Sequence, residues 1–139
     1  MYLIDTNVIS ESRKRSKADG GVRAFFKQVA KDDARVFISV VTVGELRRGV
    51  ELIRHRGDRR QATQLEKWLD QLLQVYEDRV LDITTDIAQL WGRLRVPHPE
   101  NALDKQIAAT ALIYDLTVVT RNHKDFSNTG VRLLNPFEQ

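Results

Sequence analysis

Four acidic residues lie where strands of the predicted sheet end or where helices begin. Asp5 directly follows the apolar run Tyr2–Ile4, and Asp125 lies just past a later Val-rich run. The other two, Glu45 and Asp104, lie near predicted helix starts. Because ligands of open parallel sheets bind beyond the carboxyl ends of the strands, we expect the four carboxylates to share one edge of the sheet.

Four carboxylates brought together repel one another unless a cation lies among them or some of them take up protons. Oxygen ligands without His or Cys favour a hard cation such as Mg²⁺ or Mn²⁺ over zinc. Paired ions of this kind activate a water and stabilise the leaving oxygen of a phosphodiester. The acids therefore indicate phosphoryl chemistry.

Each acid taken alone also has a structural explanation. Glu45 lies three residues after Thr42, which is the spacing of a helix capping box. Asp104 stands in the same relation to Asn101, as an acidic variant of that box. Asp5 can cap the helix that follows it. Singly, each residue favours the structural interpretation, and only their convergence favours a catalytic one.

Strand-length apolar runs alternate with helical patterns along the chain. The runs are rich in Val and Ile and mostly continuous, which is typical of parallel strands buried on both faces. They are Tyr2–Ile4, Val36–Val41, Val80–Ile83, Leu116–Thr120 and Val131–Leu134. The helical stripes span residues 22–29, 43–53, 65–76, 87–94 and 107–112. The alternation predicts an α/β fold with a mainly parallel sheet, and the positions of Trp68 and Trp91 in these stripes predict core or interface residues.

The composition is typical of one folded domain over residues 1–139, with 42% hydrophobic and 29% charged residues. The absence of cysteine excludes disulfides, thiolate zinc sites and cysteine nucleophiles, and it fits a reducing cytoplasm. No apolar run has the length of a membrane span, and no basic region precedes a long apolar stretch. We therefore expect a cytoplasmic protein without a signal peptide or a membrane association.

The stretches LIDTNVIS, TVGELRRGVEL, LDKQIAATAL and LTVVTRNHKDF carry the four acids in order. In this order and spacing the chain resembles the PIN-domain ribonucleases, in particular the VapC-type toxins of bacterial type II toxin–antitoxin pairs. Further matches in LEKWLDQLL, IAQLWGRL and GVRLLNPF extend the likeness over essentially the whole chain. The resemblance implies a three-layer α/β/α sandwich and a Mg²⁺- or Mn²⁺-dependent endoribonuclease that hydrolyses RNA phosphodiester bonds and inhibits translation.

The resemblance also implies a role for each acid. Asp5 and Asp104 would be the firmest metal ligands, and Glu45 would hold or orient a metal-bound water. Asp125 would support a second metal or act through water. The side chains that would position these carboxylates by hydrogen bonds are Thr6, Asn7, Thr120 and Asn122.

The partners implied by the resemblance are an RNA substrate, a VapB-type antitoxin and a second copy of the chain. The antitoxin would block the site and bind operator DNA, so the chain would reach DNA only through it. The chain carries a net charge of +3, and its arginines cluster after Glu45. Arg47 and Arg48 can bind RNA phosphates or an acidic stretch of the antitoxin, and plain solvation of a helix face stays open.

Two other functions remain open on the sequence. A phosphatase or phospho-acceptor domain would use Asp5 as its nucleophile, but Asn7 stands where the second acid of a DxD pair would lie. A catalytically inactive PIN-fold binding module would keep the fold without the site. The presence of all four acids argues against such decay.

Overall fold

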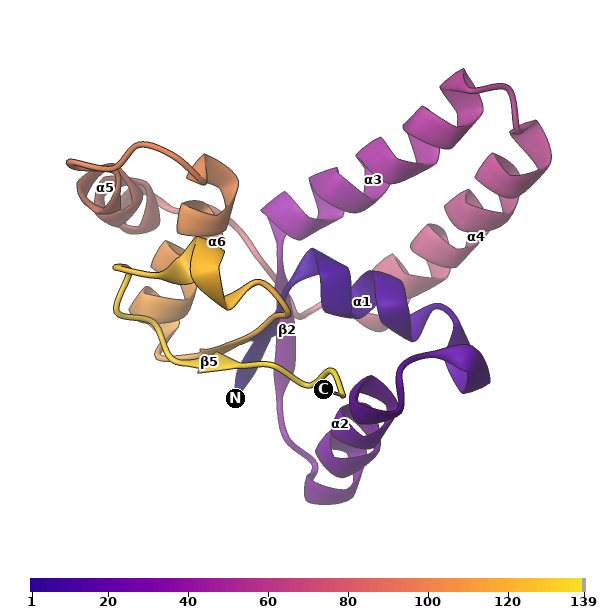
Figure 1. Ribbon diagram of the computed structural model, residues 1–139, viewed down its shortest axis with the longest axis horizontal. Coiled ribbons are helices and arrows are strands. Elements are labelled where there is room, and N and C mark those ends of the chain that lie inside the picture. Colours follow the sequence, from indigo (N-terminus) through magenta and orange to yellow (C-terminus); the bar gives the residue numbers. More distant parts are fainter. Residues whose placement is uncertain (139) are drawn as a thin grey trace.

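A five-stranded parallel sheet forms the centre of the molecule in the computed structural model, which describes residues 1–138 (Figure 1). The strand order is β3-β2-β1-β4-β5, and every neighbouring pair is parallel. The strands are β1 (Tyr2–Ile4), β2 (Val36–Ser39), β3 (Val80–Leu81), β4 (Thr117–Val119) and β5 (Leu133–Leu134). The helices are α1 (Thr6–Ser12), α2 (Gly20–Asp32), α3 (Val40–His55), α4 (Arg59–Val75), α5 (Thr85–Leu94) and α6 (Ala102–Tyr114), with the 3-10 turns η1 (Arg15–Lys17) and η2 (His123–Phe126).

Both faces of the sheet are covered by helices. Successive strand residues point to opposite faces, so Ile4 packs in the core cluster that includes α1 to α4, while Leu3 packs in the cluster that includes α6. Figure 1 shows the two groups of helices on opposite sides of the strands. The predicted three-layer α/β/α architecture with a parallel sheet is therefore confirmed.

The strand order places the predicted site at a change in the direction of winding. The chain moves outward from β1 through β2 to β3, then returns through α5 and α6 to β4 on the other side of β1. In open α/β sheets such a switch point leaves a crevice beyond the carboxyl ends of the two central strands. Asp5 follows β1 and Thr120 follows β4, so both lie at this crevice.

The start of α3 differs from the prediction. The run Val36–Val41 was expected to be a strand, but β2 ends at Ser39, whose hydroxyl accepts the N–H of Val41 at 3.0 Å and caps the helix. Glu45 therefore lies in the second turn of α3. The predicted capping box is wrong, since Thr42 lies inside the helix with its Oγ1 buried and without a hydrogen-bond partner in residues 1–138.

The acidic capping box before α6 is also wrong. Asn101 is the N-cap residue, but it has a left-handed backbone with φ of 58°, and its side chain makes no capping hydrogen bond within the described chain. By contrast, Asp5 caps α1 as expected, because it accepts the N–H of Thr6 at 2.8 Å.

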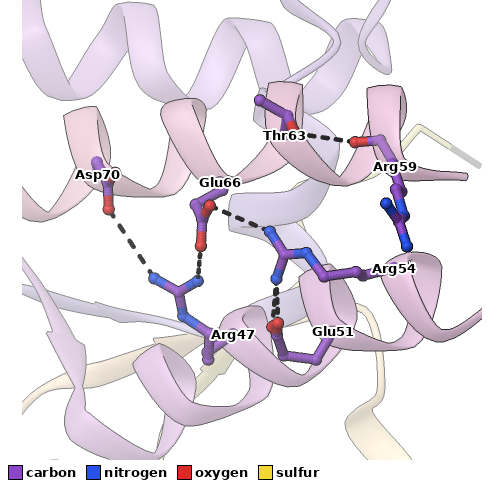
Figure 2. Close-up of polar contacts among 7 residues, drawn as sticks. All are labelled: Arg47, Glu51, Arg54, Arg59, Thr63, Glu66 and Asp70. Carbon is purple, nitrogen blue, oxygen red and sulfur yellow. Dashed lines mark hydrogen bonds and ion pairs between the residues drawn. The ribbon is translucent and has the colours of Figure 1, made fainter.

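Helices α3 and α4 form an antiparallel arm that extends away from the sheet (Figure 1). Ion pairs join the two helices: Arg47 contacts Glu66 at 2.6 Å, and Arg54 contacts the same carboxylate at 3.1 Å (Figure 2). Asp70 lies 3.9 Å from Arg47. Exposed pairs of this kind each contribute about 0–1 kcal/mol, so the arm depends mainly on the apolar contacts of its other face.

Both tryptophans lie in packed positions, as predicted. Trp68 packs against the core cluster on the side of α4, and the indole N–H of Trp91 donates to the Ala102 carbonyl at 2.8 Å. Within residues 1–138, no helix is long and apolar enough to cross a membrane. A single domain over residues 1–139 stays a prediction, and its last residue lies outside the described chain.

Two isoleucines of α6 allow a matched test of the packing. The side chain of Ile107 is fully buried where α6 packs against the sheet, whereas Ile113 is 46% exposed. We expect Ile107→Ala to lower the free energy of unfolding by about 2–5 kcal/mol, because it removes buried methylene groups and leaves a cavity. Ile113→Ala should change it by less than about 0.5 kcal/mol. Urea denaturation of both variants measures the difference, and equal losses would contradict the packing described here.

Candidate active site

Asp5 is held rigidly at the carboxyl end of β1. Its Oδ1 accepts the backbone N–H of Thr6 at 2.8 Å. Its Oδ2 accepts the Thr120 hydroxyl at 2.7 Å and the Asn7 amide at 3.1 Å. Only 3% of Asp5 is exposed. Burial raises the pKa of Asp5 above its ordinary value, although these hydrogen bonds act in the opposite direction.

Asn7 and Thr120 join the segments that follow β1 and β4. The Asn7 amide nitrogen donates to Thr120 Oγ1 at 3.3 Å, and its oxygen accepts the N–H of Arg121 at 3.1 Å. The Thr120 hydroxyl oxygen also accepts the N–H of Asn122 at 3.1 Å, so Asn122 takes part through its backbone. The structure thus brings the four predicted supporting residues around Asp5: Thr6, Asn7 and Thr120 donate to it directly, and Asn122 acts through Thr120.

Glu45 reaches the same place from α3. Its Oε1 accepts the Thr6 hydroxyl at 2.9 Å, and the backbone N–H of the same Thr6 donates to Asp5, so Thr6 links the two acids. Burial raises the pKa of the half-buried Glu45, and the negative charge of Asp5 adds to this effect. The positive charge of Arg48 acts in the opposite direction.

Asp104 lies in the first turn of α6, across the crevice. Burial first, and then the charges of Asp5, Asp125 and Glu45, raise the pKa of Asp104 from 3.8 to about 7. The other three predicted acids are therefore close enough to act on the carboxyl group of Asp104. The other three acids, which are 40, 99 and 120 residues from Asp5 along the chain, meet it at the switch point of the sheet.

The donor set fits a hard divalent cation in its chemistry. All four candidate ligands are carboxylates, which Mg²⁺ and Mn²⁺ prefer, and a cation would relieve the repulsion that raises the pKa of Asp104. Within residues 1–138, however, no three acidic or histidine side chains are close enough together to hold a metal ion. The carboxylates are gathered, and they would have to draw closer to share an ion.

The family model of the PIN domain matches residues 2–131. The chain belongs to the PIN-domain family. Toxin FitB of Neisseria gonorrhoeae is 34% identical, with 99% of each chain covered, and VapC ribonuclease Y4jK of Sinorhizobium fredii is 31% identical over the same share. The crystal structure of FitAcB from Neisseria gonorrhoeae has a TM-score of 0.83 at 33% identity, covering 98% of both chains. The resemblance read from the sequence is thus confirmed.

Sequence reasoning did not single out Lys105. This residue follows Asp104 in α6, is only 5% exposed and donates through Nζ to the His98 carbonyl. The sequence feature that could have identified Lys105 is its position in LDKQIAATAL, where most of its neighbours are buried residues of α6. A buried lysine beside a cluster of acids adds a positive charge to the rim of this PIN-domain site.

The two arginines of α3 have different surroundings. Arg47 is paired with Glu66 and Asp70 of α4 (Figure 2). Arg48 is exposed, and its charge acts on Glu45. Contact of either arginine with RNA or an antitoxin stays a prediction, and Arg48 is the better placed of the two.

The raised pKa of Asp104 predicts that the site opposes folding near neutral pH. Between about pH 4 and pH 7 the folded protein keeps a proton that the unfolded chain has lost, so stability falls as the pH rises through this window. In the presence of a metal chelator near pH 8, we expect Asp104→Asn to raise the free energy of unfolding by about 1–2 kcal/mol. The gain is smaller than the full pKa shift implies, because solvent screens this partly exposed group. The gain should shrink toward pH 4.

Thermal unfolding at several pH values measures this effect. Asp82→Asn is a matched control, because Asp82 is an exposed acid outside the cluster, and we expect no pH-dependent gain from it. A stabilisation by Asp104→Asn that is the same at pH 4 and pH 8 would contradict the electrostatic explanation.

Proposed function

We propose that this PIN-domain protein is a Mg²⁺- or Mn²⁺-dependent endoribonuclease that acts as the toxin of a VapBC-type pair in the cytoplasm, where it inhibits translation by cutting RNA. The observation that carries the proposal is the electrostatic coupling of Asp104 to Asp5, Glu45 and Asp125 at one crevice. Carboxylates this close disfavour an anionic substrate unless a cation joins them. The names of the relatives, a toxin and a VapC ribonuclease, support the same activity.

The acids of the site would have different roles in the reaction. Asp5, fixed by Thr6, Asn7 and Thr120, and Asp104, on α6, would hold the cation. When bound, the cation activates a water and stabilises the leaving oxygen of the phosphodiester. Glu45, oriented by the Thr6 hydroxyl, would position that water and accept its proton. Asp125 would support a second ion or act through water.

The residue two positions after Asp5 disfavours the phospho-acceptor alternative. Asn7 stands where the second acid of a DxD pair would lie, and its amide donates to Asp5 Oδ2 at 3.1 Å. Asn7 thus holds Asp5 in place and cannot serve as a second carboxylate. The inactive-module alternative is disfavoured because all four acids are present, although bringing them together costs stability.

A groove beside Glu45 supports the antitoxin as a partner. It has a volume of about 190 Å³ and lies between α1, α3 and α4. Its lining includes the apolar side chains of Leu46, Ile53 and Trp68 as well as Glu45. An amphipathic antitoxin segment lying here would cover the acids. A homodimer, and operator DNA reached only through the antitoxin, belong to the same proposal.

Loss of Asp5 should abolish cleavage. We expect purified Asp5→Asn to cut a mixed RNA pool at the rate of the buffer alone when Mn²⁺ is supplied, because the fixed ligand loses its charge. Asp82→Asn serves as the control and should cut at the parent rate. Gel analysis of end-labelled RNA measures both. Cleavage by folded Asp5→Asn at the parent rate would refute the metal site.

Loss of the Thr120 hydroxyl should weaken the site without removing a ligand. We expect Thr120→Val to lower the cleavage rate or the Mn²⁺ affinity about 10–100-fold, as is typical of residues that orient metal ligands. Thr110→Val is the matched control, since Thr110 is fully buried but bonds only to the Gln106 carbonyl within α6. Equal kinetics and metal titrations for the two variants would show that the 2.7 Å bond to Asp5 has no role.

A further inference from the structure

A second cavity adjoins the acid cluster. It has a volume of about 310 Å³ and lies between the loop after α5, the start of α6 and the segment at η2. It shares Asp125 with the acids, so it opens directly beside the crevice. Figure 1 shows the η2 segment alongside α6. The volume lies at the lower end of the range of about 300–1,000 Å³ that is typical of small-ligand pockets.

Lys105 supplies a buried cation to this pocket. The side chain lines the cavity and is 5% exposed. An ammonium group has three N–H donors, and one of them donates to the His98 carbonyl, the one hydrogen bond of this ammonium within residues 1–138. Two donors are therefore available to a ligand. Burying a lysine costs folding free energy unless its charge is compensated. We therefore expect the ammonium of Lys105 to interact with a partner in the pocket.

Two asparagines shape the walls of the pocket. Asn101 and Asn128 both line it, and both have left-handed backbones, with φ of 58° and 66°. Asparagine tolerates this conformation better than most residues. Each amide offers a donor and an acceptor, and Ser127 adds a hydroxyl. The walls thus present several hydrogen-bonding groups of both kinds on a defined backbone.

The charges of the pocket argue for a neutral ligand group. The ammonium of Lys105 is opposed by the carboxylates of Asp125 and Glu100, which also line the cavity. A phosphate would find no net positive charge, but the edge of a nucleobase needs only paired donors and acceptors. We propose that this pocket binds the base of the RNA nucleotide next to the scissile phosphate and thereby sets the sequence preference of cleavage. This inference rests on the proposed ribonuclease function.

The double variant His98→Ala/Asn128→Gly tests the pocket, because both residues line it. Both side chains are exposed on loops, and glycine keeps the left-handed backbone at residue 128. The control is His55→Ala/Asp33→Gly, which removes a histidine side chain at the end of α3 and places glycine at Asp33, the left-handed residue that follows α2. Each protein is incubated with a randomised RNA pool and Mn²⁺, and the fragment ends are sequenced.

We expect the pocket variant to lose base preference at one position beside the cut by about tenfold, which is within the discrimination of one well-placed base contact. The control should keep the preference of the parent. Unchanged preference in the pocket variant would overturn the inference, whether its cutting rate is normal or reduced. A reduced rate alone would indicate that the pocket holds the RNA backbone.

A binding experiment keeps the inference testable without cleavage. The four nucleoside 5′-monophosphates are titrated into the parent, the pocket variant and the control, and the backbone amide signals of Ser127 and Lys105 are followed by NMR. We expect saturable shifts with at least one base in the parent and the control, and a loss of affinity in the pocket variant. If the parent cuts no RNA, the proposed function fails, and the absence of saturable shifts would independently overturn the base pocket.

Discussion

Mutual repulsion among carboxylates is the constraint around which this PIN-domain structure is arranged. Burial first, and then the charges of three other acids, raise the pKa of Asp104 to about 7. A chain that keeps such a cluster must obtain its stability elsewhere. Here the sheet is covered on both faces, and fully buried residues such as Leu3 and Ile4 supply that stability. The opposition between a stable core and an unfavourable rim is typical of functional sites.

The two sides of the crevice differ in rigidity. Asp5 accepts hydrogen bonds on both oxygens, and the Asn7–Thr120 contact locks the strands beneath it. No hydrogen bond to the Asp104 carboxylate is present within residues 1–138. If these residues bind a cation as proposed, Asp5 would be fixed beforehand, whereas Asp104 on α6 would be free to turn toward the ion. Such a turn would be needed, because no three acids within residues 1–138 are spaced to hold a metal ion.

Much of the fold could be predicted because burial leaves a periodic trace in the sequence. The Val- and Ile-rich runs located all five strands, and the acids were placed at the correct edge from the rule for parallel sheets. The ends of the elements were less predictable, since they depend on single hydrogen bonds. Ser39 ends β2 two residues early by capping α3, and the left-handed Asn101 replaces the expected side-chain cap. The hydroxyl bond from Thr120 to Asp5 joins residues 115 positions apart, which no local pattern encodes.

The arginines near the site differ in whether acidic side chains already neutralise them. Arg47 and Arg54 are engaged by Glu66 across the α3–α4 arm, so their charges are largely compensated before any substrate approaches (Figure 2). In the proposed function, the attraction of RNA would then come from other cations at the rim, such as the exposed Arg48, and from a bound metal. Such a site would bind its substrate weakly in the absence of metal, because the acids would dominate the local potential. Metal binding would therefore govern both the chemistry and the association with RNA.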